Sequence, residues 1–361
     1  MIDYRDSFVS RLANEVEDLI EERSAHADEV FASLLELAQQ NSEVFARYLQ
    51  RFGAGLGVPD RAFKASSPYL FPGVEPALTF ETSGTTGVLK GRAHYSELGA
   101  RLLRATILAG ARRNIVAELD RPAIVRLVPA HEHAPSMVMA FGMQLIADTY
   151  ADARASGSVV GPNGLDFERF AQLLDRAVAA DQPVVLIGGS FAFVNVCERL
   201  QNMHKRWQLP AGSRMVDAGG FKGRSRSLSV EQLRGLVADT LGITAARSTN
   251  IFGMTELASQ LYDAEDRALG PSGERPKRVL PHVWPRLRDP ESLQLMAAGT
   301  GLLEVVDLCV LDRPCVVLTG DLAVSDGNGV ALAGRIRGSG SRGCSLTLDA
   351  LTALGDHDVV A

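Results

Sequence analysis

The pattern of hydrophobic and polar residues changes twice along the chain. Over residues 1–65, apolar residues recur every three or four positions with charged residues between them, as in FVSRLANEVEDLIEE and ADEVFASLLELAQQNSEVFARYLQRF. This spacing predicts amphipathic helices. Over residues 66–298, helical stretches alternate with short apolar runs, which are PALTFETSG, PAIVRLVPA, QPVVLIGG, RMVDAGG and RSTNIFG. Such alternation predicts an α/β sheet domain.

The last part of the chain, residues 299–361, has shorter apolar runs. LLEVVDL, PCVVLTGDLAV and GVALAG predict a small β subdomain, which a tail follows. Within the α/β part, Ser229 and Gln232 have the spacing of a capping box and predict the start of a helix over VEQLRGLVADTLG. The pattern therefore predicts a helical N-terminal segment, an α/β core and a small β subdomain with a tail.

Composition excludes several classes of protein. The 361 residues include 37 Lys and Arg against 43 Asp and Glu, and the net charge of −6 argues against a broad nucleic-acid-binding surface. Four scattered cysteines are too few for a secreted disulfide scaffold. The first residues lack the pattern of a signal peptide, and no apolar run is long enough to span a membrane. We expect a cytoplasmic protein without a membrane span or a nucleic-acid partner, whose oligomeric state the sequence does not indicate.

A glycine-rich loop, FETSGTTGVLKG, follows the apolar run PALTF. Glycines let backbone N–H groups approach a phosphate, hydroxyls add donors, and a lysine adds a mobile cation. The chain has only five lysines, so a lysine in this loop is notable. The spacing is not that of a Walker A loop, and the alternative is an ordinary turn between strands. The candidate phosphate-binding residues are Thr82, Ser83, Gly84, Thr85, Thr86, Gly87 and Lys90.

The segment TSGTTGVLKG resembles the phosphate loop of the adenylate-forming enzymes, which join ATP to a carboxylate and release pyrophosphate. Two later segments match motifs of that family in the same order. IFGMTE, residues 251–256, resembles its Y-G-x-T-E motif, and LTGDLAV, residues 318–324, resembles its T-G-D motif. Arg335, in AGRIRG, resembles a later Gly-Arg that approaches the ribose. The resemblance implies the α/β fold of the family's N-terminal domain and an AMP site that includes Gly219, Gly220, Gly253 and Met254.

The matching residues also suit nucleotide chemistry by type. Phe252 has a flat apolar face for adenine. Thr255 can hydrogen-bond a phosphate, and Glu256 is a hard oxygen ligand for the Mg²⁺ that accompanies ATP. Asp321 can accept hydrogen bonds from both ribose hydroxyls. The alternatives are a core phenylalanine, a helix that begins at Thr255 and runs over TELASQLYD, and an aspartate in a turn.

The chain departs from the family after Arg335. Only 26 residues follow it, without a lysine, and Gly338 stands where the family has a hinge aspartate. We therefore expect a truncated C-terminal end without the mobile lid domain and its catalytic lysine. RMVDAGG predicts a strand followed by a loop at the carboxyl edge of the sheet, where α/β sites gather. We hypothesise that Lys222 in this loop replaces the lid lysine; the alternative is a solvated lysine beside Arg224 and Arg226.

The ending GSGSRGCSL sets Cys344 beside Arg342 in a Gly/Ser-rich stretch, and a nearby cation favours the reactive thiolate. Cys197, Cys309 and Cys315 lie in apolar patterns typical of buried cysteines. This ending, with VDAGGFKGR and FGMTELASQLYD, is similar to the acyl-protein synthetase of bacterial bioluminescence, the long-chain-fatty-acid ligase component of fatty acid reductase. In that family the acid is activated as acyl-AMP, passes to a cysteine near the C-terminus, and is received by a reductase partner. Cys344 is the matching position.

HEHAPSM lies where the general family often has a substrate-lining histidine or aromatic, so His133 is a candidate substrate residue. The two histidines lack a further ligand at metal spacing, and we expect no structural metal. The resemblance implies ATP and Mg²⁺ as cofactors and a fatty acid as substrate. Three alternatives stay open: transfer to a carrier-protein thiol, CoA or an amine; a non-catalytic subunit that binds nucleotide or acyl-AMP; and a nucleotidyltransferase of another kind.

Overall fold

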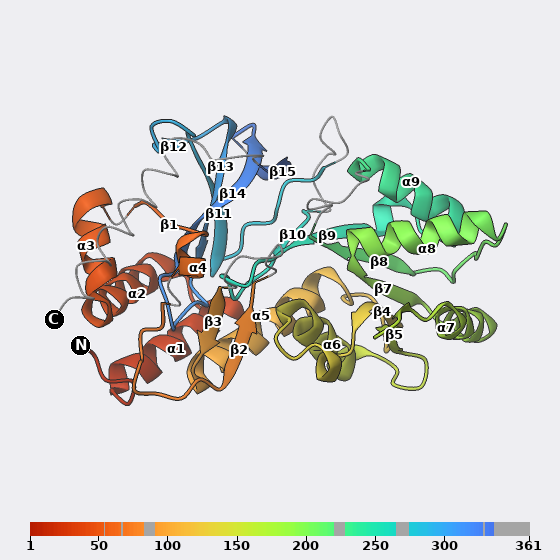
Figure 1. Cartoon of the computed structure of the whole chain (residues 1–361), viewed down its shortest axis with the longest axis horizontal. Helices are drawn as coiled ribbons and strands as arrows, with labels where there is room; N and C mark the ends of the chain where they lie inside the picture. Colours follow the sequence, from red (N-terminus) through yellow and green to blue (C-terminus); the bar gives the residue numbers. More distant parts are fainter. Residues whose placement is uncertain are drawn as a thin grey trace. The chain divides into compact units, whose positions relative to one another are not determined.

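The structure is a computed structural model that describes residues 1–53, 55–65, 68–82, 91–219, 228–264, 274–327 and 329–335 (Figure 1). Contacts within the chain divide it into two compact units. Unit 1 comprises Met1–Thr106, Met254–Leu261 and Pro276–Ala361, and unit 2 comprises Ile107–Gly253 and Tyr262–Arg275. Each unit is therefore assembled from segments that lie far apart in the sequence.

Unit 1 begins with the predicted helical segment. Asp6 caps the first helix by accepting a hydrogen bond from the N–H of Phe8, as short acidic side chains do at helix starts. Ser42 ends the second helix and caps the third, where its hydroxyl accepts from the N–H of Phe45 at 3.2 Å. The apolar pattern predicted over residues 27–52 is therefore two helices. The helices of this segment are α1 (Ser7–Ile20), α2 (Ala27–Asn41), α3 (Glu43–Phe52) and the short α4 (Ala62–Ala65).

The larger sheet of unit 1 has the order β1-β14-β13-β11-β12, with β15 paired to β14. Its strands are β1 (Val58–Pro59), β11 (Val283–Arg288), β12 (Leu295–Met296), β13 (Gly299–Asp307), β14 (Val316–Ser325) and β15 (Val330–Arg335). A separate hairpin pairs β2 (Leu78–Glu81) with β3 (Arg92–Tyr95), and α5 (Glu97–Asn114) follows it. The strands predicted after residue 299 are present, and the sheet joins them to strands from both earlier segments. The three-part division of the sequence stays a prediction.

A buried glutamate fixes the connection that leads from α3 to β1. Glu304 of β13 is fully buried, and its carboxylate lies 2.7 Å from Arg286 and 3.0 Å from Arg288. It also accepts a hydrogen bond from the N–H of Gly57 at 2.7 Å. Because a buried charge needs partners, the two guanidiniums and this amide make the arrangement possible. The helical segment and the sheet are thereby joined.

Unit 2 is built on a parallel sheet, as the α/β pattern predicts. The strand order is β10-β9-β8-β7-β4-β5-β6, and the pairs from β9 to β5 are parallel. The strands are β4 (Ala123–Pro129), β5 (Gly157–Gly161), β6 (Gly164–Leu165), β7 (Val184–Gly189), β8 (Arg214–Ala218), β9 (Ser248–Phe252) and β10 (Leu261–Tyr262). The helical elements are η1 (His131–His133), α6 (Val138–Tyr150), α7 (Phe167–Ala179), α8 (Ser190–Asn202), α9 (Val230–Leu241) and η2 (Ala245–Arg247). The capping box predicted at Ser229 and Gln232 is confirmed at the start of α9.

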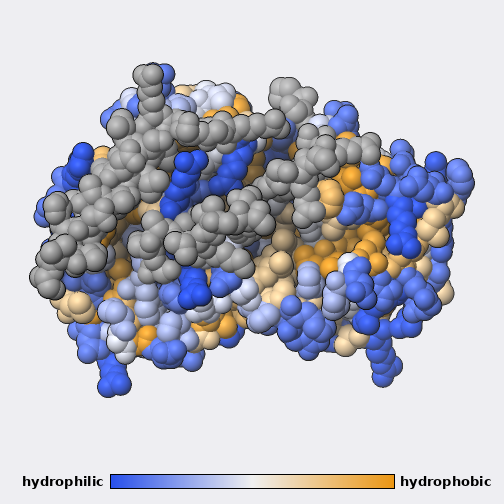
Figure 2. Space-filling model, viewed as in Figure 1, coloured by the Kyte–Doolittle hydropathy of each residue, from blue (hydrophilic) through white to orange (hydrophobic). Residues whose placement is uncertain are grey.

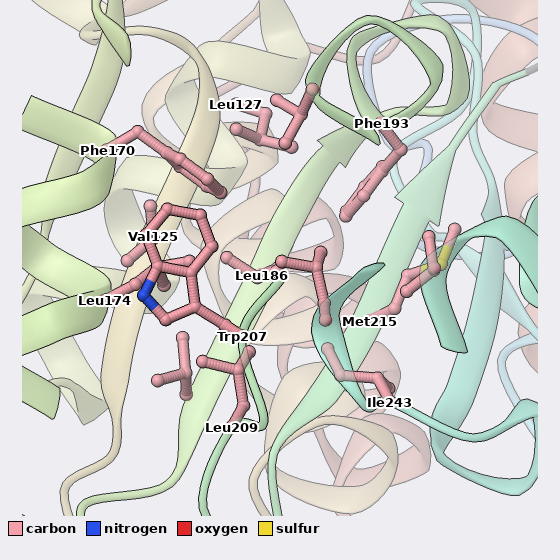
Figure 3. Packing of buried hydrophobic residues seen from close by; sticks show 14 of the residues in the cluster. Val125, Leu127, Phe170, Leu174, Leu186, Phe193, Trp207, Leu209, Met215 and Ile243 are labelled. Atoms are coloured by element: carbon pink, nitrogen blue, oxygen red, sulfur yellow. The ribbon is translucent and has the colours of Figure 1, made fainter. Parts of the chain in front are cut away.

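The hydrophobic core of unit 2 lies between one face of this sheet and helices α7, α8 and α9 (Figure 3). Val125 and Leu186 extend from neighbouring strands, and Phe170 of α7 packs edge-on against Trp207 at 6.0 Å between ring centroids. In Figure 1, α8 and α9 lie above the strands and α6 lies below them. Because helices cover both faces, β7 has no charged or polar side chain and β4 has only one, Arg126, which explains the nearly continuous apolar runs in the sequence.

The face of unit 2 that Figure 2 shows carries both polar and apolar residues. Figure 2 shows hydrophilic side chains over α7, α8 and α9, with hydrophobic residues between them. Among the residues that the structure describes, no helix is long and apolar enough to cross a membrane.

Candidate functional site

The glycine-rich loop begins and ends at the β2–β3 hairpin. Glu81 lies opposite Arg92, and the N–H of Thr82 donates to the carbonyl of Gly91 at 2.8 Å. The N–H of Gly91 donates in turn to Oγ1 of Thr82 at 3.0 Å. The hairpin thus holds the two ends of the loop together, and the hydroxyl of Thr82 has a partner within it. The other candidate residues of the loop, Ser83, Gly84, Thr85, Thr86, Gly87 and Lys90, lie outside the described residues.

In unit 2, polar side chains gather where the parallel strands end. Asp217 of β8 is buried, and its carboxylate accepts hydrogen bonds from the hydroxyl of Ser190 at 2.7 Å and the amide of Asn250 at 2.8 Å. Ser190 begins α8, and its hydroxyl lies 3.3 Å from the carbonyl of Gly219. Gly219 has a φ of +79°, which favours glycine. These bonds tie the ends of β7, β8 and β9 into one edge, and Gly220 and Lys222 lie outside the described residues.

Phe252 ends β9 at the same edge and is 8% exposed, and Gly253 after it is exposed. The strand that leads to Phe252 is held by a buried ion pair. Asp263 lies 3.0 Å from Arg234 of α9 and accepts a hydrogen bond from the N–H of Asn250 at 3.0 Å. Burial lowers the pKa of Arg234, and the charge of Asp263 opposes that shift. The ion pair between Arg234 and Asp263 thus fixes the position of the end of β9 at this edge of the sheet.

The alternative of a helix that begins at Thr255 is wrong. Residues 254–260 form a turn and an irregular segment, and strand β10 follows. The fully buried carboxylate of Asp307 accepts hydrogen bonds from the N–H groups of Ala258 and Ser259, both at 2.7 Å, and from the hydroxyl of Ser259. A helix from Thr255 would instead require the N–H of Ser259 to donate to the carbonyl of Thr255. A contact between distant residues therefore overrides the local helical pattern.

Arg313 joins this segment to the hairpin of the glycine-rich loop. Its guanidinium is 1% exposed and donates to the carbonyl of Glu256 at 3.0 Å, to the hydroxyl of Tyr95 at 2.7 Å and to the carbonyl of His94 at 3.4 Å. The same guanidinium lies over the Tyr95 ring, 4.4 Å from its centroid. Tyr95 donates to the carbonyl of Leu257 at 2.9 Å. The backbone on both sides of the Glu256 side chain, which is itself buried, is thus held from β3 and from Arg313.

Asp321 and Arg335 face each other across β14 and β15. They are paired in register, and Nε of Arg335 lies 4.0 Å from the Asp321 carboxylate. The buried Asp60 accepts from the same guanidinium at 2.7 Å, and its N–H donates to the carbonyl of Leu318 at 2.9 Å. The structure therefore brings two of the candidate nucleotide-binding residues together and adds Asp60, which the motifs do not indicate.

His133 lies in η1, directly after β4, and is exposed. Its neighbour His131 packs edge-on against Phe141 of α6, with 5.3 Å between ring centroids. The strand β4 thus ends at the same edge of unit 2 as Gly219 and Phe252, since β4, β7, β8 and β9 run parallel. An exposed ring at this edge is available to a ligand.

The expectation that three cysteines are buried is confirmed for Cys197, Cys309 and Cys315. Burial raises the pKa of Cys197 to about 11 and that of Cys315 to about 12. Burial also raises the pKa of Cys309, so all three thiols stay protonated at neutral pH and are unsuited to nucleophilic attack. Cys344 lies outside the described residues.

The motifs do not indicate four charged residues that shape these segments: Asp60, Asp217, Asp307 and Arg313. Three of them stand inside apolar runs, in RMVDAGG, LLEVVDL and VLDRPCVVL. A charged residue within a buried strand or its flank needs partners, so such interruptions were a usable signal for fixed polar contacts. Asp60, after the short strand β1, carries no comparable signal.

A search of the sequence against models of protein families gives no match, and a search against curated proteins gives none either. Solved structures do match. A 2-hydroxyisobutyryl-CoA ligase in complex with 2-HIB-AMP and CoA is 15% identical, with a TM-score of 0.60 over 87% of this chain and 69% of that one. The A-PCP protein McyG, complexed with phenylalanyl-adenylate, is 16% identical, with a TM-score of 0.52 over 73% and 47%. A long-chain-fatty-acid-CoA ligase from Archaeoglobus fulgidus is 16% identical, with a TM-score of 0.51 over 73% and 52%.

These likenesses establish the fold. The chain has the α/β fold of the N-terminal domain of adenylate-forming enzymes, as the resemblance of its motifs implies. It spans about half the length of the A-PCP protein and of the fatty-acid ligase. At such low identity the comparisons extend to the fold alone.

Proposed function

We propose that the protein uses ATP to activate a carboxylic acid as acyl-AMP, with release of pyrophosphate. One observation carries the proposal: three motifs in the order of the adenylate-forming enzymes occur on the fold of those enzymes, each at a strand. The glycine-rich loop follows β2, IFGMTE includes the end of β9, and LTGDLAV lies in β14. A long-chain fatty acid, as in the acyl-protein synthetases that the sequence resembles, is the first substrate to test.

In the first step, a carboxylate oxygen attacks the α-phosphorus of ATP, and the bond from that phosphorus to the bridging oxygen breaks as pyrophosphate leaves. Thr85, Thr86 and Lys90 orient the phosphates, and Phe252 stacks on the adenine. Asp321 accepts from the ribose hydroxyls beside Arg335. Lys222 offsets the charge of the departing pyrophosphate.

Mg²⁺ suits the site, because proteins hold it with one or two carboxylates and the phosphates of the substrate. Glu256 is a buried carboxylate in the motif segment, and Arg313 and Tyr95 fix the backbone on either side of it. The ion would neutralise phosphate charge. Thr255, next to Glu256, would donate to the α-phosphate.

In the second step, we infer that the thiolate of Cys344 attacks the acyl carbonyl carbon. The bond from that carbon to the AMP oxygen breaks, AMP leaves, and a thioester forms; the thiol proton passes to solvent. Because the mixed anhydride stores the energy of ATP, this transfer needs mainly a thiolate in the right position. A reductase or a carrier protein would then receive the acyl group.

The test is ATP–pyrophosphate exchange with fatty, aromatic and amino acids, followed by the intact mass of the protein. We expect exchange with at least one acid and a mass increase equal to its acyl group. Cys344→Ser should keep the exchange and lose the adduct, and Cys309→Ala, which removes a buried thiol, should keep both. A retained adduct in Cys344→Ser excludes that cysteine as the carrier and favours CoA, an amine or another protein thiol as acceptor.

The exchange assay also separates the other classes of function. A subunit that only binds nucleotide or acyl-AMP gives no exchange with any acid. A nucleotidyltransferase of another kind gives exchange that no carboxylic acid stimulates. Full adenylate formation by Lys222→Met would exclude the proposed role of that lysine.

A further inference from the structure

Arg126 of β4 is a buried cation to which no described residue forms a hydrogen bond or an ion pair. It is 7% exposed and its Nε atom is enclosed. Other buried arginines of the chain differ. Arg234 pairs with Asp263, Arg288 pairs with Glu304, and Arg313 donates to backbone carbonyls.

The surroundings of Arg126 explain why no described residue bonds to its guanidinium. Its neighbours along the strand, Val125 and Leu127, point into the hydrophobic cluster of Figure 3. Side chains alternate along a strand, so Arg126 points to the opposite face, where α6 contacts β4. The side chains that α6 buries are all apolar: Ala140, Phe141, Met143, Ile146 and Ala147. The side chains that α6 buries therefore offer the arginine no acceptor.

The electrostatic setting is unfavourable for an arginine without a ligand. Burial lowers the pKa of Arg126, and repulsion by Arg169 adds to this, against an attraction to Asp148. Asp148 is exposed and accepts a hydrogen bond from Gln144 at 2.6 Å. A buried charge without a hydrogen-bonded partner destabilises the folded protein. A cation kept in this position is explained by an anion that binds it.

We propose that Arg126 binds a second anionic group, at the far end of the acid that the protein activates, so that the preferred substrate is a dicarboxylic acid. This rests on the proposed function. The reacting carboxylate would lie at the edge where β4 ends, and Arg126 lies three residues before Pro129, which corresponds to roughly 10 Å along a strand. A guanidinium binds a carboxylate through two parallel hydrogen bonds, so recognition would be specific.

The experiment compares dicarboxylates from succinate to sebacate with monocarboxylates of equal chain length in ATP–pyrophosphate exchange. We expect the wild-type protein to prefer one of the dicarboxylates by about tenfold or more in kcat/KM. Arg126→Met should abolish this preference while activity with the monocarboxylate remains, and Arg126→Lys should keep part of it. Arg169→Met, which removes an exposed arginine nearby, is the matched control and should keep the full preference.

A structural role for Arg126 would give different results. If the arginine binds substrate, Arg126→Met should unfold at the same temperature as the wild type or higher, since it removes an uncompensated charge. A wild-type preference for monocarboxylates, or an unchanged preference in Arg126→Met, overturns the proposal. So does a large fall in the unfolding temperature of Arg126→Met with its preference intact.

The failure of the proposed function can be recognised separately. If no acid supports exchange, the unfolding temperature is measured with each dicarboxylate, its monocarboxylate and inorganic phosphate. A rise with a dicarboxylate alone, lost in Arg126→Met, supports the anion site although the proposed function has failed. A rise with phosphate as well shows a site for any anion and overturns the assignment to the acid, as does no rise at all.

Discussion

Replacement of Arg313 by methionine should impair both the stability of unit 1 and the use of Mg²⁺. The substitution keeps most of the volume of the buried stem and removes every donor of the guanidinium. The carbonyls of Glu256 and His94 lose a donor, and the hydroxyl of Tyr95 loses a charged partner. The stretch that carries Glu256 is then held from β3 by the single bond between Tyr95 and Leu257.

The expected size of the effect follows from these contacts. A hydrogen bond to a charged group contributes about 1.5–3 kcal/mol, and a buried acceptor left without its donor costs about 1–3 kcal/mol. Removal of a buried charge offsets part of this loss. Arg313→Met should therefore lower the free energy of unfolding by about 3 kcal/mol, and Arg313→Lys, which keeps the charge and one bond, by about half of that.

Stability is measured by urea unfolding, followed by the fluorescence of Trp284, which lies in unit 1, in a Trp207→Phe background. Function is measured by ATP–pyrophosphate exchange as a function of Mg²⁺ concentration, at temperatures where the variants are folded. Because Glu256 is the proposed Mg²⁺ ligand, a displaced Glu256 should raise the Mg²⁺ concentration that gives half-maximal exchange by about tenfold. Such a change corresponds to a loss of about 1.4 kcal/mol in the free energy of Mg²⁺ binding.

Arg288→Met is the matched control, since Arg288 is also buried in unit 1 but pairs with Glu304, away from the motif segment. It should destabilise the protein while the Mg²⁺ dependence of the folded protein stays unchanged. A normal Mg²⁺ dependence of Arg313→Met would refute the role of Arg313 in positioning Glu256. A normal free energy of unfolding would refute the energetic reasoning.

Two further variants test other parts of unit 1. Asp60→Asn removes the negative partner of Arg335 and should raise the KM for ATP several-fold with little change in kcat. The control Asp18→Asn, in an exposed ion pair, should change neither constant. An unchanged KM of Asp60→Asn in steady-state exchange kinetics would contradict this prediction. Burial raises the pKa of Asp312 from its ordinary value of 3.8 to about 6, so the folded state binds a proton more tightly than the unfolded state. The contribution of protonated Asp312 to stability is therefore fully present below about pH 4 and is lost as the pH rises through 6. Asp312→Asn should remove this fall in the free energy of unfolding, which is on the order of 3 kcal/mol. Urea unfolding at several pH values measures it, and a parallel pH dependence of stability in wild type and variant would contradict the reasoning.

Much of the fold could be predicted from the sequence because burial leaves local patterns. The runs PAIVRLVPA, QPVVLIGG and RMVDAGG are strands β4, β7 and β8, whose two faces are both covered. The first helices follow from their apolar spacing, and the start of α9 follows from its capping box. The motif resemblance led to the family fold. These signals all lie within a few residues of the elements that they describe.

The details of the candidate site could not be predicted in the same way, because they depend on contacts between distant residues. The helical pattern after Thr255 yields to Asp307, which binds the N–H groups of Ala258 and Ser259 from 49 and 48 positions further along the chain. Asp60 meets Arg335 across 275 positions. No local pattern records such a pairing, so the sequence could suggest the chemistry of a residue but not its partner.

The two kinds of interaction have different roles in this protein. Hydrophobic burial is not directional, so the apolar runs decide which elements form and which faces they cover, but leave the exact position of a loop open. Hydrogen bonds to charged groups are directional, and in unit 1 they converge on the segments that carry the motifs: Asp307 and Arg313 on residues 256–259, and Asp60 on Arg335. Substitution of these charges should therefore change the geometry of a still folded unit, whereas substitution of core residues should change only how much of the unit is folded. Exchange kinetics of folded variants distinguish the two, because a core variant alters the amount of active protein and leaves its KM unchanged.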